Sequence, residues 1–386
     1  MLRNQKVRNL CFLLSLCCCT AYLLLHPQEA VDAAKTGMHL CVNVVVPSLF
    51  PFLILSGLVV RLGFAQSLKR ILEPVMRPVF GLSGSCASAL ALGLIGGYPV
   101  GAKTAVSLYR ERQINKKEVE RLLAFCNNCG PAFLFGVVGA GVFANSRIGL
   151  LLYLIHILAS ILVGIVFQLL FGSVPSSFNK THPANEMQSF PNALTGSIQD
   201  AISSSLNIGG FIVSFTILIR FAFSAGLIPA IGGLLARIPG ISHSDSEAML
   251  VGMIELSSGV WGLKEASAAL PSKVAMAAFM LGWAGLCVHC QVLSFTEDED
   301  LSIRPYLTGK LLHGIISTLL FGLLFRLAPV RATLASNYAE QVAYVSAQSF
   351  LKTLLQGTGL AAAAFLLFWL CFILQKKGGN RQRRAL

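Results

Sequence analysis

Residues 91–103 read ALGLIGGYPVGAK, and this stretch decides the fold. It closes a charge-free apolar run over residues 78–102. Glycine and proline interrupt the run at Gly81, Gly84, Gly93, Gly96, Gly97, Pro99 and Gly101. Irregular backbone at membrane depth occurs only where protein buries it or where it lines a watery cavity. The stretch therefore predicts a broken or re-entrant helix of the kind that forms transport sites. The alternative is close helix packing through small residues.

The composition around this stretch indicates an integral membrane protein. Only 12% of the 386 residues are charged and 55% are hydrophobic, with a mean hydropathy of +0.70. Soluble domains carry about 25% charged residues. The 11 cysteines all lie in apolar stretches, which argues against a secreted disulfide framework. We expect an all-α polytopic membrane protein, and the composition excludes disordered and fibrous proteins.

Charge-free runs give the order of the expected helices. They cover residues 9–28, 36–60, 78–102, 122–146, 148–179, 201–219, 221–236, 274–296, 311–325 and 353–375. About 20 apolar residues are needed to cross the hydrocarbon core. The run at 9–28 has no small-residue cleavage site after it, so we expect a retained first span rather than a signal peptide.

The net charge of +13 lies mostly in short loops and in both tails. Such a distribution is typical of positive-inside topology and of contact with anionic membrane lipid. Nucleic acid is not an expected partner, because no basic face carries interleaved aromatic residues. Both basic termini are expected in the cytoplasm, as are the basic stretches 61–77 and 110–121. If these two stretches share a side, the run at 78–102 must enter the membrane and return.

The two halves of the chain repeat a similar order of motifs. Residues 96–103 and 125–131 of the first half correspond to residues 254–259 and 285–291 of the second. Duplicated halves with interrupted segments are typical of secondary transporters. We expect an N-terminal tail and first span (1–36), a first repeat (37–172), a polar loop (173–192), a second repeat (193–330), and a last span with a basic tail (331–386). The pattern leaves open whether the repeats are parallel or inverted.

Polar residues inside these apolar segments are the candidate substrate-binding residues, because buried polar groups are costly in hydrocarbon. They are Lys103, Asn127, Asn128, Glu255, His289 and Gln291. A lysine, amides and an imidazole suit an anionic carboxylate, whereas Glu255 suits a pairing with Lys103, a coupling proton or a cation. The alternatives are a snorkelling Lys103, a Glu255 that caps a helix, and amides that satisfy the backbone at a helix break.

Further residues mark the expected breaks. These broken-helix motifs are Pro47, Ser48, Gly97, Tyr98, Pro99, Gly101, Gly130, Pro131, Gly209, Gly210 and Gly259. Two Cys-x-x-Cys pairs, at Cys126 and Cys129 and at Cys287 and Cys290, are weak candidates for a soft metal or a redox pair. We expect no metal and no cofactor. Motifs of common enzyme classes are missing from the sequence, and we expect no enzymatic activity.

Several strings together resemble one known family. They are VVPSLFPFLILSGLV (45–59), GGYPVGAK (96–103), RLLAFCNNCGPAFLFGVVGAGVF (121–143), IGGFIVSF (208–215), GMIELSSGV (252–260) and LGWAGLCVHCQVLSF (281–295). The chain resembles the sporulation integral membrane protein YlbJ family over residues 37–329. This resemblance implies two gate, or nucleoside-recognition, domains and a fold distantly similar to concentrative nucleoside transporters. It also implies an endospore-forming source and movement of dipicolinate from the mother cell towards the forespore, across the outer forespore membrane.

The sequence leaves three functional hypotheses. The first is a transporter of a small anionic solute, with dipicolinate favoured by the resemblance and with a proton or cation as a possible coupling ion. The second is a structural membrane protein of spore-envelope assembly, which would act with other sporulation membrane proteins. The third is a nucleoside or metal permease.

Overall fold

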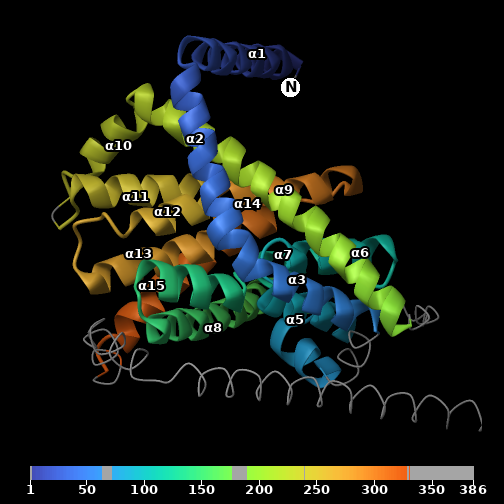
Figure 1. The fold of residues 1–386 in the computed structure, drawn as a ribbon. Helices are drawn as coiled ribbons and strands as arrows, with labels where there is room; N and C mark the ends of the chain where they lie inside the picture. Colours follow the sequence, from blue (N-terminus) through green and yellow to red (C-terminus); the bar gives the residue numbers. More distant parts are fainter. Residues whose placement is uncertain (1, 63–71, 176–188, 239, 328–329, 331–386) are drawn as a thin grey trace, which may run out of the picture. The chain divides into compact units, whose positions relative to one another are not determined.

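The protein is described here by a computed structural model, which covers residues 2–62, 72–175, 189–238, 240–327 and 330 (Figure 1). Within these ranges every regular element is a helix, which confirms the all-α class. The predicted last span at 353–375 and most of the predicted polar loop at 173–192 lie outside the described residues.

The first half of the chain consists of the following helices, in which η1, η2 and η4 are π-helices and η3 is a 3₁₀ turn. They are α1 (Leu2–Leu25), α2 (Pro27–Leu40), η1 (Cys41–Val45), α3 (Val46–Arg61), η2 (Met76–Phe80), η3 (Gly84–Cys86), α5 (Ala87–Gly96), α6 (Val100–Arg110), α7 (Lys116–Cys126), η4 (Phe133–Val142) and α8 (Ser146–Phe171).

The second half begins with the longest helix of the described residues. Its elements are α9 (Phe190–Ser224), α10 (Leu227–Leu235), α11 (His243–Ile254), α12 (Leu256–Gly262), α13 (Leu270–Trp283), α14 (Gly285–Thr296), the 3₁₀ turn η5 (Glu297–Glu299) and α15 (Arg304–Leu324). Figure 1 shows α9 running along α2 and α3, which are its main packing partners.

Four segments of the described residues are long and apolar enough to cross a membrane. They are α8, α9, the combined segment Leu270–Thr296 and α15. Two bent pairs raise the number to six: Pro27–Val45 with Leu49–Leu55, bent by 55°, and Leu72–Phe80 with Gly84–Gly96, bent by 103°. The expected first span at 9–28 covers most of α1 and the start of α2, and the apolar part of α1, Leu16–Leu25, is shorter than these segments.

Helix α8 has one exposed apolar face and one face that is buried against the protein. Leu150, Leu154 and Leu158 recur every four residues on its exposed face, whereas Leu152 and Ile155 are buried. A helix that is apolar all round and exposes one leucine stripe is typical of a membrane span. The chain is therefore an integral membrane protein with several apolar helices.

The decisive stretch forms a tight helical hairpin. Helix α5 ends at Gly96, residues 97–99 leave the helical conformation, and α6 begins at Val100. A Cβ on Gly101 would overlap the carbonyl oxygen of Cys126 and would lie 2.9 Å from the Cα of Gly93. Glycine at positions 93 and 101 is thus what allows α5, α6 and the end of α7 to touch through their backbones.

The second half has a matching hairpin, with its break at a different residue from the one expected. Helices α11 and α12 are separated by Glu255 alone, and Gly259 lies inside α12, where it packs on Gly252. The predicted break at Gly259 is wrong by four residues, because this glycine serves close packing. The chain around Pro47 and Ser48 is helical, and the 55° bend falls between Val45 and Leu49.

Gly209 and Gly210 also differ from expectation. Both lie in the uninterrupted helix α9, so the expected break is not found there. A Cβ on Gly209 would lie 2.8 Å from the Sγ of Cys41, whereas Gly210 has nothing within 4 Å. The first glycine accommodates a helix contact, and neither has a positive φ.

A charged contact joins the two halves outside the spans. Arg110 Nε donates to Glu299 at 2.6 Å, and Lys116 Nζ donates to Asp300 at 3.0 Å. The hydrogen bond to Asp300 raises the pKa of Lys116 above its usual value. The acidic run after α14 therefore meets the last residue of α6 and the first residue of α7, and all four side chains keep contact with solvent.

Two glycine substitutions test the hairpin packing. Gly101→Ala should lower the thermal unfolding midpoint in detergent, because overpacking of this kind costs about 1–3 kcal/mol. Gly210→Ala, the matched control in a helix interior with open space, should leave the midpoint unchanged or raise it slightly. Equal midpoints for both variants would contradict the backbone contact at Gly101.

Candidate functional site

Two helix interruptions meet in each half. In the first half, a Cβ on Gly97 would lie 2.9 Å from the nitrogen of Gly130, so the break before α6 touches the break after α7. In the second half, a Cβ on Gly285 would lie 3.1 Å from the nitrogen of Leu256, so the break after α13 touches the break before α12. Gly97 and Gly285 also adopt positive φ values of 78° and 82°, which glycine tolerates best.

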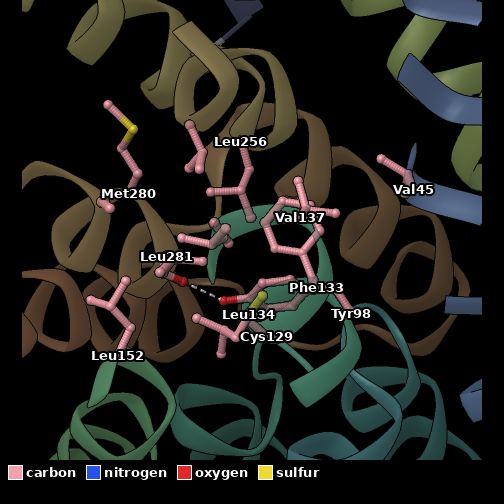
Figure 2. Packing of buried hydrophobic residues seen from close by; sticks show 14 of the residues in the cluster. Val45, Tyr98, Cys129, Phe133, Leu134, Val137, Leu152, Leu256, Met280 and Leu281 are labelled. Atoms are coloured by element: carbon pink, nitrogen blue, oxygen red, sulfur yellow. Dashed lines mark hydrogen bonds between the residues drawn. The ribbon is translucent and has the colours of Figure 1, made fainter. Parts of the chain in front are cut away.

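Residues of both halves line one small pocket that opens to the outside. Its walls are mainly apolar, with Phe133 from the first half and Ile208 from the second. The polar and sulfur-bearing residues on its walls are Tyr98, Cys129, Glu255, Ser257, Cys287 and Gln291. Figure 2 shows Tyr98, Cys129 and Phe133 close to Leu256 and Leu281, which come from the other half.

Glu255 is the N-cap residue of α12. Its side chain is 2% exposed, and its two carboxylate oxygens accept from the backbone nitrogens of Ser257 at 2.9 Å and Ser258 at 2.6 Å. Within the described part of the chain, no cation forms an ion pair with Glu255. The helix-cap alternative thus describes its bonding, and the carboxylate still lines the pocket.

Lys103 does not reach this pocket. It follows the Gly101 contact on α6, and its side chain is exposed. Gln291 does reach it: the residue is 5% exposed, and its amide has only the weak acceptor Cys287 Sγ, at 3.8 Å. An amide that is buried and nearly unpaired is available to a ligand carboxylate or ring nitrogen.

Asn127, Asn128 and His289 are buried beside the pocket rather than on its wall. Asn128 Nδ2 donates to the Phe125 carbonyl at 2.8 Å and to Ser160 Oγ at 3.2 Å, as expected for an amide that satisfies a helix end. Asn127 Oδ1 accepts only weakly from the Ala102 nitrogen, at 3.4 Å. Asn127 Nδ2, Asn128 Oδ1 and His289 Nε2 have no partner among the described residues.

The buried cation of this region is Lys310, which the sequence analysis missed. Its side chain is fully buried in α15, and its Nζ donates to Tyr98 Oη at 2.9 Å and to the Asn127 carbonyl at 3.0 Å. The Asn127 carbonyl lies just past the end of α7, and cations are favoured at a helix C-terminus. No carboxylate among the described residues pairs with Lys310.

Tyr98, from the first half, binds this cation and helix α13 of the second half. Its hydroxyl donates to the Leu281 carbonyl at 2.7 Å, the bond drawn dashed in Figure 2, and accepts from Lys310. Its ring lines the pocket, with Lys310 Nζ 5.0 Å from the ring centroid. One side chain therefore forms a pocket wall and binds α13 and α15.

Two histidines complete the buried cluster. His313 Nδ1 lies 3.5 Å from Lys310 Nζ, and His313 Nε2 lies 3.0 Å from the His156 carbonyl. Because a carbonyl only accepts, His313 carries its proton on Nε2 and offers Nδ1 to the lysine. The two imidazole rings lie 4.1 Å apart, and His156 Nε2 accepts from the Cys129 nitrogen at 3.0 Å.

A periodic signal marks these residues in the sequence. Tyr306, Lys310, His313 and Ser317 recur every three to four residues and share the buried face of α15, each at most 1% exposed. The charge-free run at 311–325 begins one residue after Lys310, so this lysine is not among the candidate residues of the sequence analysis. A polar stripe at helical spacing through an apolar span would have identified the cluster.

The cysteines give no metal centre in the described residues. Cys126, Cys129 and Cys287 are buried and unpaired, whereas Cys290 is exposed. No group of three or more histidines, cysteines, aspartates or glutamates in the described ranges is placed to hold a metal ion.

The Tyr98 hydroxyl is expected to stabilise the contact between the halves. Tyr98→Phe removes one of the acceptors of Lys310 and the side-chain donor of the Leu281 carbonyl, so a loss of about 1–3 kcal/mol and a lower thermal midpoint in detergent are expected. Tyr153→Phe is the matched control, since its hydroxyl makes one longer bond of 3.3 Å to the Leu94 carbonyl. A Tyr98→Phe midpoint no lower than that of the control would contradict this role.

Comparisons with known proteins agree with this architecture. The family model described as "Gate: Nucleoside recognition" matches residues 42–170, which include the first hairpin and the break after α7. The chain is 32% identical over 330 residues to the sporulation integral membrane protein YlbJ of Bacillus subtilis (strain 168), covering 80% of each chain. No solved structure matches. The chain belongs to the sporulation integral membrane protein YlbJ family.

Proposed function

We propose that this protein is a membrane transporter of a small anionic solute. The observation that carries the proposal is the pocket at which interrupted helices of both halves meet. Many secondary transporters bind their solute at such a junction of two halves and expose it alternately to the two sides of the membrane. A buried lysine lies behind one wall and supplies the positive charge that an anion requires in a low-dielectric site.

The solute that we propose is dipicolinate, a planar pyridine ring with two carboxylates. The apolar walls, including the Tyr98 ring and Phe133, suit a flat aromatic solute. Gln291 offers an almost unpaired amide for a carboxylate or for the ring nitrogen, and Ser257 offers a hydroxyl. The unpaired polar atoms of Asn127, Asn128 and His289 lie behind this wall and become available if the breaks shift during transport.

The biological setting is proposed from the relative, which is named for sporulation. In this setting the protein moves dipicolinate from the mother cell towards the forespore, across the outer forespore membrane. Its basic termini face the cytoplasm, and other sporulation membrane proteins act beside it. The name of the gate model makes a nucleoside the main competing solute, and the two pocket cysteines make a soft metal ion a further one.

Uptake into liposomes that contain the purified protein tests the proposal. We expect labelled dipicolinate to enter and to exchange with unlabelled dipicolinate. Gln291→Ala should lower the rate by about tenfold or more, the effect of losing a hydrogen bond to a charged group. Lys103→Ala, which removes an exposed cation outside the pocket, should retain uptake.

Three outcomes would overturn the proposal. Absence of both uptake and exchange in a folded protein would favour a structural role in spore-envelope assembly. Strong competition by nucleosides, with no exchange of dipicolinate, would favour a nucleoside permease. Metal uptake that is lost in Cys129→Ser and Cys287→Ser would favour a metal permease.

A further inference from the structure

We propose that the coupling ion of this transporter is a proton, and that Lys310 is the residue that carries it. This inference rests on the proposed function and adds the ion and its site. It follows from three features of the described residues: the place of the ammonium, the hydrogen-bond roles of its neighbours, and the carboxylate that already lines the pocket.

The Lys310 ammonium occupies the place that a coupling cation takes in other transporter folds. In those folds, carbonyls at the C-terminal ends of broken helices coordinate the ion. Here α7 ends at Cys126, and the carbonyl of Asn127 accepts from Lys310 Nζ at 3.0 Å. Because this cation is a side chain of the protein, its charge is gained or lost only when Lys310 Nζ binds or releases a proton.

The neighbours of Lys310 are arranged for the protonated form. An ammonium has three donors, and three acceptors surround it: Tyr98 Oη at 2.9 Å, the Asn127 carbonyl at 3.0 Å and His313 Nδ1 at 3.5 Å. The Tyr98 hydroxyl gives its own proton to Leu281, so its oxygen accepts from the lysine. Among the residues that the structure describes, no carboxylate pairs with this ammonium, so the site can release the proton without leaving an unpaired anion.

His313 provides the first step of an exit path. A proton that passes from Lys310 Nζ to His313 Nδ1 leaves a neutral amine and an imidazolium, and no other atom is transferred. The Nε2–H bond of His313 to the His156 carbonyl stays in place. Tyr306 and Ser317, at the two ends of the polar face of α15, are 11 positions apart, or about 17 Å at 1.5 Å per residue, roughly half the hydrocarbon core.

Other titratable groups lie near Lys310, on the elements that pack against α15 or against the two helix interruptions of the first half. They are Tyr98 in the hairpin, Cys126 and Cys129 at the break after α7, His156 on α8, His289 on α14, and Tyr306 and His313 on α15 itself. Helix α13 contributes the Leu281 carbonyl. None of these groups is a carboxylate.

Binding of the anionic solute is coupled to protonation of Lys310 because the pocket also contains a carboxylate. Glu255 lines the pocket, so an anionic solute meets a like charge there. The Tyr98 ring lines the pocket, and its centroid lies 5.0 Å from the Lys310 ammonium nitrogen. A protonated Lys310 therefore favours the anion, and by linkage the bound anion favours the proton. Solute and proton then cross together.

The test uses the full-length protein in liposomes with labelled dipicolinate and an internal pH dye. We expect three results for the parent protein: exchange at equal pH, accumulation driven by an acidic exterior, and proton entry when dipicolinate is added. Lys310→Met should reduce proton-driven accumulation by about tenfold or more, a typical coupling factor. Lys35→Met, a lysine with a side chain 70% exposed, is the matched control and should behave as the parent.

Lys310→Arg separates the charge from its titration. Arginine keeps a cation but does not release a proton in proteins. We expect this variant to exchange dipicolinate at equal pH and to lose proton-driven accumulation. Lys310→Arg also tests the role of Lys310 if Lys310→Met does not fold. Size-exclusion chromatography and thermal unfolding show whether each variant is folded.

The outcomes distinguish this inference from the function on which it rests. Exchange without proton entry in the parent, or accumulation driven by a sodium gradient, would overturn proton coupling and leave the transporter intact. Proton-driven accumulation that survives in Lys310→Arg, or that is lost in Glu255→Gln while Lys310→Met retains it, would overturn the role of Lys310. Absence of exchange in the parent would overturn the transporter itself.

Discussion

The contact on which the rest of the site depends is the hydrogen bond from the buried Lys310 ammonium to the carbonyl at the end of α7. A helix that stops inside a membrane leaves carbonyls without partners, and a buried cation is costly without acceptors. Each group satisfies the other. Tyr98 extends this contact by accepting from Lys310 and donating to Leu281, so that a break in the first half is held by two helices of the second.

Small residues make that contact geometrically possible. A Cβ on Gly309 would lie 2.7 Å from the Cα of Ala124, which shows how closely α15 approaches α7 one residue before Lys310. Gly282 and Gly314 meet in the same way, with 2.5 Å between an added Cβ and the facing Cα, and bring α13 against α15. In the absence of a hydrophobic force between helices, such backbone packing and interhelical hydrogen bonds hold spans together.

Much of the fold could be predicted because the signals are local. The breaks at residues 97–99 and 127–130 follow from glycine, proline and paired amides in otherwise apolar runs, and the structure leaves helical conformation at both. Gly209, Gly210 and Gly259 carried the same local signal but lie within helices. Glycine serves both chain breaks and close packing: Gly97 has a positive φ at a break, whereas Gly209 and Gly259 pack against Cys41 and Gly252 from within helices.

The sequence by itself determined that this is a helical membrane protein with interrupted segments, because hydropathy and the backbone limits of glycine and proline act within a few residues. Tertiary structure alone decided which lysine is buried. Lys103 and Lys310 both stand at the edge of apolar runs, yet one is exposed and the other has no exposed surface. The difference arises from helix phase and from neighbours: α15 turns Lys310 towards the end of α7 and Tyr98, which are far away in the chain.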